Sequence, residues 1–166
     1  MTDHERIAEL KHRFNLSYHI DYAFTADQMV GGLQGKRILE VGGSLPRDFV
    51  FETFGVRQWI ALEETQYWDE TLSTGHITGT PPDIGKILRL RDQTPATLSD
   101  YDVLTGKIED YPEALSGCFD VVFSIAAFEH IARLPEALEK IHTSLRPGGI
   151  LFSLFAPVWC ASVPLT

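Results

Sequence analysis

Residues 37–43, Arg-Ile-Leu-Glu-Val-Gly-Gly, combine an apolar strand, an acid and paired glycines. Glycines directly after a buried strand let the backbone turn tightly and approach a bulky ligand that a Cβ would obstruct. Glu40 stands two residues before the first glycine, where its carboxylate could meet a cationic ligand. The pattern predicts the ligand-binding edge of a nucleotide-type α/β fold, with Glu40, Gly42 and Gly43 in the site.

Two further groups along the chain have side chains suited to this site. Glu63 ends the next apolar run, and one carboxylate can accept hydrogen bonds from two hydroxyls. Glu129 and His130 follow a later apolar run, and an imidazole titrates near neutrality, as a general base must. For His130 a pocket-shaping role and a catalytic role both remain open.

Length and composition limit the function. The chain has 166 residues, 44% hydrophobic and 22% charged, which is typical of one globular domain. Its net charge is −9, and no run of Lys or Arg favours nucleic acid. No apolar run reaches membrane-spanning length, and the first residues lack the order of a secretory signal. We therefore expect a cytoplasmic protein that binds neither nucleic acid nor membrane.

No metal site is expected. Cys118 and Cys160 lie far apart, without a Cys-x-x-Cys pattern or a nearby pair of histidines. We interpret both as reduced, structural residues rather than as parts of a disulfide framework or a zinc site.

Five short apolar runs must form the sheet that positions these residues. Runs of this kind, separated by helical segments, are typical of parallel strands buried on both faces. The predicted strands are residues 37–41, 58–62, 101–104, 119–125 and 150–155.

Helix signals lie before and between these strands. Capping patterns beginning at Thr2 and Thr25 predict two N-terminal helices, the second ended by Gly31-Gly32. The other predicted helices cover residues 46–54, a segment near 84–91, and 134–145 ended by Pro147-Gly148-Gly149. We predict a helical flank or lid over residues 1–34 and a core over residues 35–166.

Three motifs carry a family resemblance. They are Ile-Leu-Glu40-Val-Gly42-Gly43, the segment Phe119 to Ile131, and Leu145-Arg-Pro-Gly-Gly-Ile-Leu-Phe152. In this order they resemble the class I S-adenosylmethionine-dependent methyltransferases, specifically the small-molecule, type 11-like branch. The resemblance implies a Rossmann-like, doubly wound, mostly parallel sheet of about five strands in the order 3-2-1-4-5, with S-adenosylmethionine as cofactor and S-adenosylhomocysteine as product.

The resemblance also implies roles for particular residues. In the family, the acid and glycines after the first strand surround the amino-acid part of the cofactor, which here means Glu40, Gly42, Gly43 and Ser44. An acid at the end of the second strand binds the ribose hydroxyls, the position of Glu63. The adenine contact falls to Ile108 and to Glu109 or Asp110. Ser124 lines the cofactor after the fourth strand.

The sequence departs from the family pattern at three places. Ser44 and Pro46 replace the later glycines of the loop, and Lys107 stands where an acid usually contacts adenine. The sequence also stops at Thr166, without the helices and two strands that normally follow the fifth strand. We expect either a missing C-terminal part or a partner chain over an exposed sheet edge, with a homodimer as the hypothesis.

Three functions follow from these patterns. The first is an S-adenosylmethionine-dependent methyltransferase acting on a small metabolite or a sugar-containing intermediate, with His130 as the candidate base. The alternative is a catalytically inactive, methyltransferase-like binding or assembly module. An NAD-dependent oxidoreductase ranks well below both, because the loop lacks Gly-x-Gly-x-x-Gly.

Overall fold

The computed structural model describes residues 3–16, 18–43, 45–64 and 87–155. Over these residues the strands form one sheet in the order β3-β4-β2-β1-β5-β6, and all neighbouring pairs are parallel. The strands are β1 (Arg37–Val41), β2 (Gln58–Glu63), β3 (Leu88–Arg89), β4 (Tyr101–Thr105), β5 (Phe119–Ile125) and β6 (Leu145–Leu154).

The predicted strand order is confirmed. The five predicted strands are β1, β2, β4, β5 and β6, and their spatial order is the expected 3-2-1-4-5. The short β3 is an addition at the outer edge of β4. The helix predicted near residues 84–91 is wrong for the part described, because Leu88–Arg89 pairs with β4 and Leu90–Asp92 is a 3-10 turn. Pairing with the edge of β4 outweighs the local helix preference.

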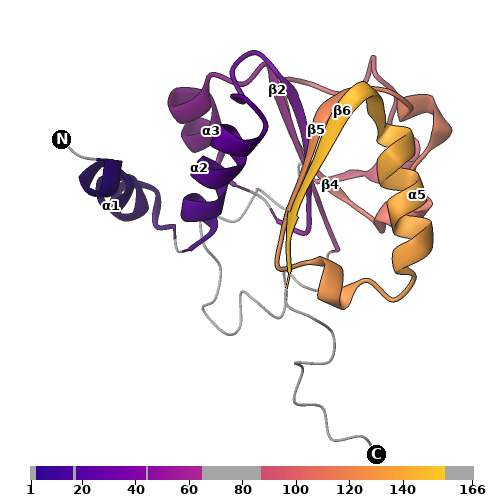
Figure 1. Cartoon of the computed structure of the whole chain (residues 1–166). Coiled ribbons are helices and arrows are strands. Elements are labelled where there is room, and N and C mark those ends of the chain that lie inside the picture. The colour runs from indigo at the N-terminus through magenta and orange to yellow at the C-terminus, as the bar shows by residue number, and fades with distance from the viewer. Residues whose placement is uncertain (1–2, 17, 44, 65–86, 156–166) are drawn as a thin grey trace, which may run out of the picture.

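Helices cover both faces of this sheet. Figure 1 shows α2 and α3 on one side of the sheet and α5 on the other. The helices are α1 (Asp3–Phe14), α2 (His19–Met29), α3 (Arg47–Phe54) and α5 (Leu134–Ser144), and the other 3-10 turns are η3 (Ile108–Asp110), η4 (Glu113–Leu115) and η5 (Phe128–His130). The sheet is thus the middle of three layers, as in doubly wound folds.

Alternation along the strands divides the core between the two faces. Ile38 packs with α2 and α3, whereas Leu39 and Val41 pack with α5 and η3. Successive side chains of a strand point to opposite faces, so a buried parallel strand must be apolar at nearly every position. Glu40 is the exception within β1, and at 4% exposure it is buried like its neighbours.

Helix α2 begins earlier than its sequence pattern predicts. The expected N-cap, Thr25, lies inside the helix, where its hydroxyl donates to the carbonyl of Asp21 at 2.9 Å. Burial of Ile20 and Ala23 against the sheet outweighs the capping signal, because packing supplies most helix stability in proteins. The predicted end is confirmed: α2 stops at Met29, and Gly31 adopts a φ of +73°.

The segment joining α5 to β6 also differs from the prediction. Helix α5 ends at Ser144, and β6 begins at Leu145, so the Pro147-Gly148-Gly149 segment lies within β6 instead of before it. The ladder with β5 is irregular there, passing from Leu145 opposite Phe119 to Ile150 opposite Val121. A bulge of this kind accommodates a proline that cannot donate to the ladder.

Candidate functional site

The loop after β1 has no room for side chains at its two glycines. Gly42 adopts a φ of +78°, and a Cβ there would lie 2.1 Å from the Cβ of Ala127. A Cβ on Gly43 would lie 2.6 Å from Oε1 of Glu40. The loop is therefore closed against the segment after β5 on one side and against its own acid on the other. Ser44, also predicted to bind the cofactor, lies outside the described residues.

Glu40, in β1, holds this loop in place by a hydrogen bond to its backbone. Its Oε2 accepts hydrogen bonds from the backbone N–H of Leu45 at 2.9 Å and from the indole N–H of Trp59 at 2.6 Å. Burial raises the pKa of Glu40 to about 7, the two hydrogen bonds oppose this rise, and the nearby Glu63 adds to it. Both of these hydrogen bonds use Oε2, and none between described residues uses Oε1.

Tyr101 holds the same loop from β4. Its hydroxyl donates to the carbonyl of Leu45 at 2.8 Å, so both polar backbone groups of Leu45 are fixed. Burial, together with the charge of Glu40, raises the pKa of Tyr101, which keeps the phenol protonated as a donor. No local pattern in the sequence marks Trp59 or Tyr101 as a support of this loop, because both reach it from neighbouring strands. In the sheet Trp59 aligns with Ile38, two positions before Glu40, so the side chains of Trp59 and Glu40 lie on the same face.

Glu63 ends β2 beside the glycine loop. The backbone N–H of Gly42 donates to the carbonyl of Leu62 at 2.8 Å, and that of Gly106 donates to the carbonyl of Glu63 at 3.2 Å. Burial raises the pKa of Glu63 to about 7; the Glu64 amide, 2.9 Å from Oε1, lowers it, and the Glu64 carboxylate raises it. Two acids that favour protonation near neutrality therefore stand at the ends of adjacent strands.

The residues predicted to contact adenine, Ile108 and Glu109 or Asp110, follow β4, which pairs with β2 beside Glu63. Thr105 aligns with Glu63 in the ladder, and the chain then passes through Gly106 into η3. Ile108 is 3% exposed and packs in the core, so it offers the site backbone rather than side-chain surface. Glu109 is half-buried at the same edge, whereas Lys107 is exposed.

The end of β5 closes the other side of the loop. Ser124 is fully buried, and its hydroxyl donates to the carbonyl of Val41 at 2.9 Å. This hydroxyl proton joins the ends of β1 and β5, which leaves only the oxygen lone pairs for a ligand. Ala126 adopts a φ of +53°, a strained backbone for a residue with a Cβ.

The residues predicted to do chemistry follow in η5. His130 is exposed, and Glu129 is half-buried, with an Oε2 that is buried and makes no hydrogen bond within the described part of the chain. Tyr18, before α2, is near enough that Glu129 and burial raise its pKa, burial having the larger effect. The N-terminal segment thus approaches the same edge of the sheet as Glu129.

The polar side chains at the ends of β1 and β2 suit an organic cofactor. Among the described residues, no three His, Cys, Asp or Glu side chains form a group that could hold a metal ion. Two buried carboxylates beside a tight glycine turn instead fit a ligand that carries a positive charge and neighbouring hydroxyls. In the same part of the chain, no helix is long and apolar enough to cross a membrane.

A family model for the methyltransferase domain matches residues 64–153, more than half of the chain. The chain belongs to the methyltransferase domain family. The cofactor of this domain is S-adenosylmethionine, whose positive charges and ribose hydroxyls fit the carboxylate acceptors described above. The match begins after Glu63, so it is independent of the glycine loop and of both acids.

Solved structures share the fold of this methyltransferase domain at low sequence identity. A methyltransferase of Methanococcus maripaludis has a TM-score of 0.53 and 14% identity, with 81% of this chain and 54% of that chain covered. A protein of Galdieria sulphuraria described as a sarcosine dimethylglycine methyltransferase has a TM-score of 0.52 and 16% identity, covering 80% and 43%. A methyltransferase of Haloferax volcanii, solved in complex with the activator Trm112, has a TM-score of 0.50 and 19% identity, covering 90% and 55%.

The chain therefore spans about half the length of these solved proteins. No curated protein sequence matches it. At such identities the structural likeness establishes the fold alone, since one fold serves many functions.

Proposed function

We propose that this chain is the cofactor-binding core of an S-adenosylmethionine-dependent methyltransferase that acts on a small metabolite or a sugar-containing intermediate. The observation that carries the proposal is the placement of Glu40 and Glu63, both with a pKa near 7, beside two glycines that have no space for a Cβ. A cationic ligand would favour the ionised forms of both acids, and ribose hydroxyls would donate to Glu63.

Within this proposal each residue has a defined task. Glu40 holds the loop through Leu45 and Trp59 and offers Oε1 to the amino-acid end of the cofactor. The cofactor supplies an activated methyl group, so the protein must mainly align the acceptor with the methyl–sulfur bond and exclude water. His130, at the end of the turn η5 that follows β5, is the proposed base for an acceptor hydroxyl.

Calorimetric titration with S-adenosylmethionine and S-adenosylhomocysteine tests the cofactor site. We expect both ligands to bind the intact chain, and Glu63→Ala to abolish detectable binding because the ribose hydroxyls lose their acceptor. Glu113→Ala, which removes an exposed acid on η4, is the matched control and should bind like the wild type. Absence of heat with either ligand would overturn the proposal.

The same titration separates the proposal from an inactive binding module. Binding together with methyl transfer to an acceptor, slowed by His130→Ala but not by the exposed-site control His142→Ala, is expected for the enzyme. Binding without transfer to any member of a broad panel of small acceptors would favour the module.

A homodimer through the β6 edge is a second part of the proposal. Ile150, Leu154 and Phe155 are each more than 40% exposed at or beside this outer strand. Exposed apolar residues on an unpaired strand favour association. The Haloferax volcanii relative, which is bound to an activator protein, suggests a different partner chain as the alternative. A monomeric mass in light scattering at high concentration would exclude the homodimer.

A further inference from the structure

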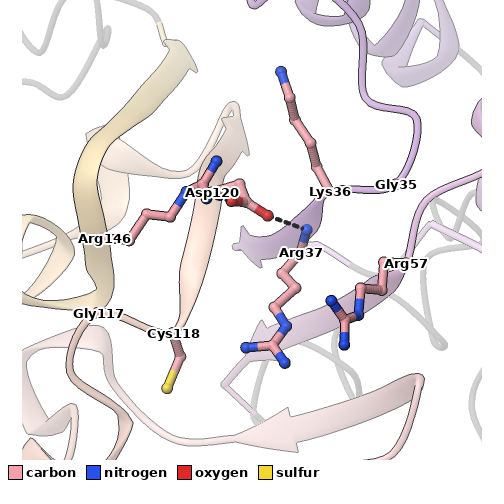
Figure 2. A pocket seen from close by; sticks show the side chains of 8 residues that line it. All are labelled: Gly35, Lys36, Arg37, Arg57, Gly117, Cys118, Asp120 and Arg146. Carbon is pink, nitrogen blue, oxygen red and sulfur yellow. Dashed lines mark hydrogen bonds and ion pairs between the residues drawn. The ribbon is translucent and has the colours of Figure 1, made fainter.

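A cavity lies where the parallel strands begin, at the end opposite to the proposed cofactor site. It has a volume of about 320 Å³ and is lined at the points where β1, β2, β5 and β6 begin. Figure 2 shows its lining residues, which are Gly35, Lys36, Arg37, Arg57, Gly117, Cys118, Asp120 and Arg146. Because parallel strands all begin at one edge, the fold brings together residues from four distant parts of the chain.

The charges around this cavity are mainly positive. It is lined by four cationic side chains and one acidic side chain, in a chain whose net charge is −9. The acid, Asp120, accepts from the backbone N–H of Arg37 at 2.6 Å and pairs with Nε of Arg146 at 2.5 Å. Asp120 therefore already has partners and leaves the other cations uncompensated.

Arg37 and Arg57 are the cavity's cations without a side-chain partner among the described residues, whereas Nζ of Lys36 donates to the carbonyl of Val30 at 3.0 Å. Within the described part of the chain, neither guanidinium makes an ion pair or a side-chain hydrogen bond. Figure 2 shows both groups extending to the same side of the cavity, while Arg146 turns to Asp120 and Lys36 extends the other way. Their backbones are adjacent, since the N–H of Arg57 donates to the carbonyl of Lys36 at 2.9 Å.

Two neighbouring guanidinium groups repel each other unless an anion lies between them. A guanidinium presents a planar fork of N–H donors that matches the oxygens of a phosphate, and it remains charged at every relevant pH. The cavity volume is at the lower end of the range for small-molecule sites, about 300 to 1,000 Å³, and so exceeds the needs of one inorganic ion.

We propose that this cavity binds the terminal phosphate of a small phosphorylated metabolite between Arg37 and Arg57, at the edge of the sheet opposite to the cofactor site. Because the two sites lie at opposite ends of the strands, this proposal does not depend on the proposed methyl transfer. The sequence contains no basic cluster that would predict this site, because its cations are dispersed over positions 36, 37, 57 and 146.

Titration calorimetry of the whole chain with inorganic phosphate, glycerol 3-phosphate and glucose 6-phosphate, none of which carries an adenosine group, tests the proposal. We expect the two organic phosphates to bind more tightly than inorganic phosphate, and acetate not to bind. Arg37→Gln and Arg57→Gln should each weaken binding about tenfold, the loss of one charge-assisted hydrogen bond of about 1.4 kcal/mol. The phosphate affinity of Arg37→Lys should lie between those of the wild type and Arg37→Gln, because lysine keeps the positive charge but lacks the planar pair of N–H donors.

Arg91→Gln is the matched control, because it removes one exposed positive charge outside the cavity, in the 3-10 turn Leu90–Asp92. It should leave phosphate affinity unchanged. Unfolding curves of each variant show whether a loss of binding reflects a loss of fold, and retained binding of S-adenosylhomocysteine by the Arg variants confirms that the cofactor site is intact. Equal affinity of wild type and both Gln variants, or tighter binding of a phosphoserine peptide than of any small phosphate, would overturn the proposal.

The pH dependence provides a second readout. The second ionisation of a phosphate monoester has a pKa of about 6, whereas both guanidinium groups stay charged. Affinity should therefore fall as the pH is lowered through about 6. Binding that is unchanged between pH 5 and pH 7 would overturn the assignment of a doubly charged phosphate.

Discussion

Gly42 and Glu40 illustrate how single residues determine the shape of the site. Gly42 needs both a left-handed backbone and an absent side chain, because Ala127 occupies the space that a Cβ would fill. Glu40 would be unfavourable in a buried strand without donors, and Leu45 and Trp59 supply them. Function at this scale depends on close contacts between residues far apart in the sequence.

The two requirements at Gly42 can be separated by mutation. Gly42→Ala should lower the free energy of unfolding by about 2 to 5 kcal/mol, because backbone strain and a steric clash add. Gly31→Ala has a matching φ of +73° but open space around its Cβ, so it should cost only about 1 to 2 kcal/mol. Urea denaturation of both variants measures the difference, and equal losses would show that the clash is relieved at no cost.

At the scale of elements, packing decides where helices and strands begin. Helix α2 extends N-terminal to its capping pattern because Ile20 and Ala23 fill the core beside the sheet. Likewise, β6 begins immediately after α5, and its proline and glycines form an irregularity in the ladder with β5. Local signals predicted that these elements exist, and tertiary contacts set their limits.

The substitution Thr25→Ala tests where α2 begins, because the free energy of unfolding should rise if Thr25 lies inside the helix and fall if it is the N-cap. Inside α2, where its exposed hydroxyl returns to the carbonyl of Asp21, Thr25→Ala should raise the free energy of unfolding by roughly 0.3 to 0.7 kcal/mol, the difference in helix propensity. As an N-cap, the same substitution would cost about 1 kcal/mol. Thermal unfolding of the variant distinguishes the two, and a loss of stability would contradict the helix limits described here.

At the scale of the whole molecule, the two ends of the parallel strands collect different titratable side chains. The acids Glu40 and Glu63 lie where the strands end, and the cations Arg37 and Arg57 lie where the strands begin. Each edge collects residues from several strands, so the contrast cannot be seen along the sequence. The parallel topology thus allows two sites of different chemistry in one small sheet.

The buried acids predict how stability depends on pH. Burial raises the pKa of Glu40 and of Glu63 to about 7 in the folded state, above the usual 4.5 of a glutamate, so the folded state retains protons that the unfolded state has released. Stability is then fully present below about pH 4.5 for these two groups and is lost as the pH rises to about 7, by roughly 1 to 3 kcal/mol per group.

Chemical denaturation between pH 4.5 and 8 measures this loss. Glu40→Gln keeps an acceptor for Leu45 and Trp59 but cannot ionise, so its stability should depend less steeply on pH than that of the wild type. Glu9→Gln, at an exposed position of α1, removes the same charge and should leave the dependence unchanged. Equal slopes for wild type and Glu40→Gln would contradict the burial argument.

The sequence by itself predicted five of the six strands, because buried parallel strands have a local pattern, and the family resemblance of its motifs predicted their order. The cofactor site at the ends of these strands stays a prediction. The sequence could not determine that Trp59 and Tyr101 support the Glu40 loop, or that the hydroxyl proton of Ser124 is used by Val41. It also gave no sign that Arg37 and Arg57 line one cavity. These facts were decided only by the tertiary structure, since each is a contact between strands whose register and twist bring distant residues together.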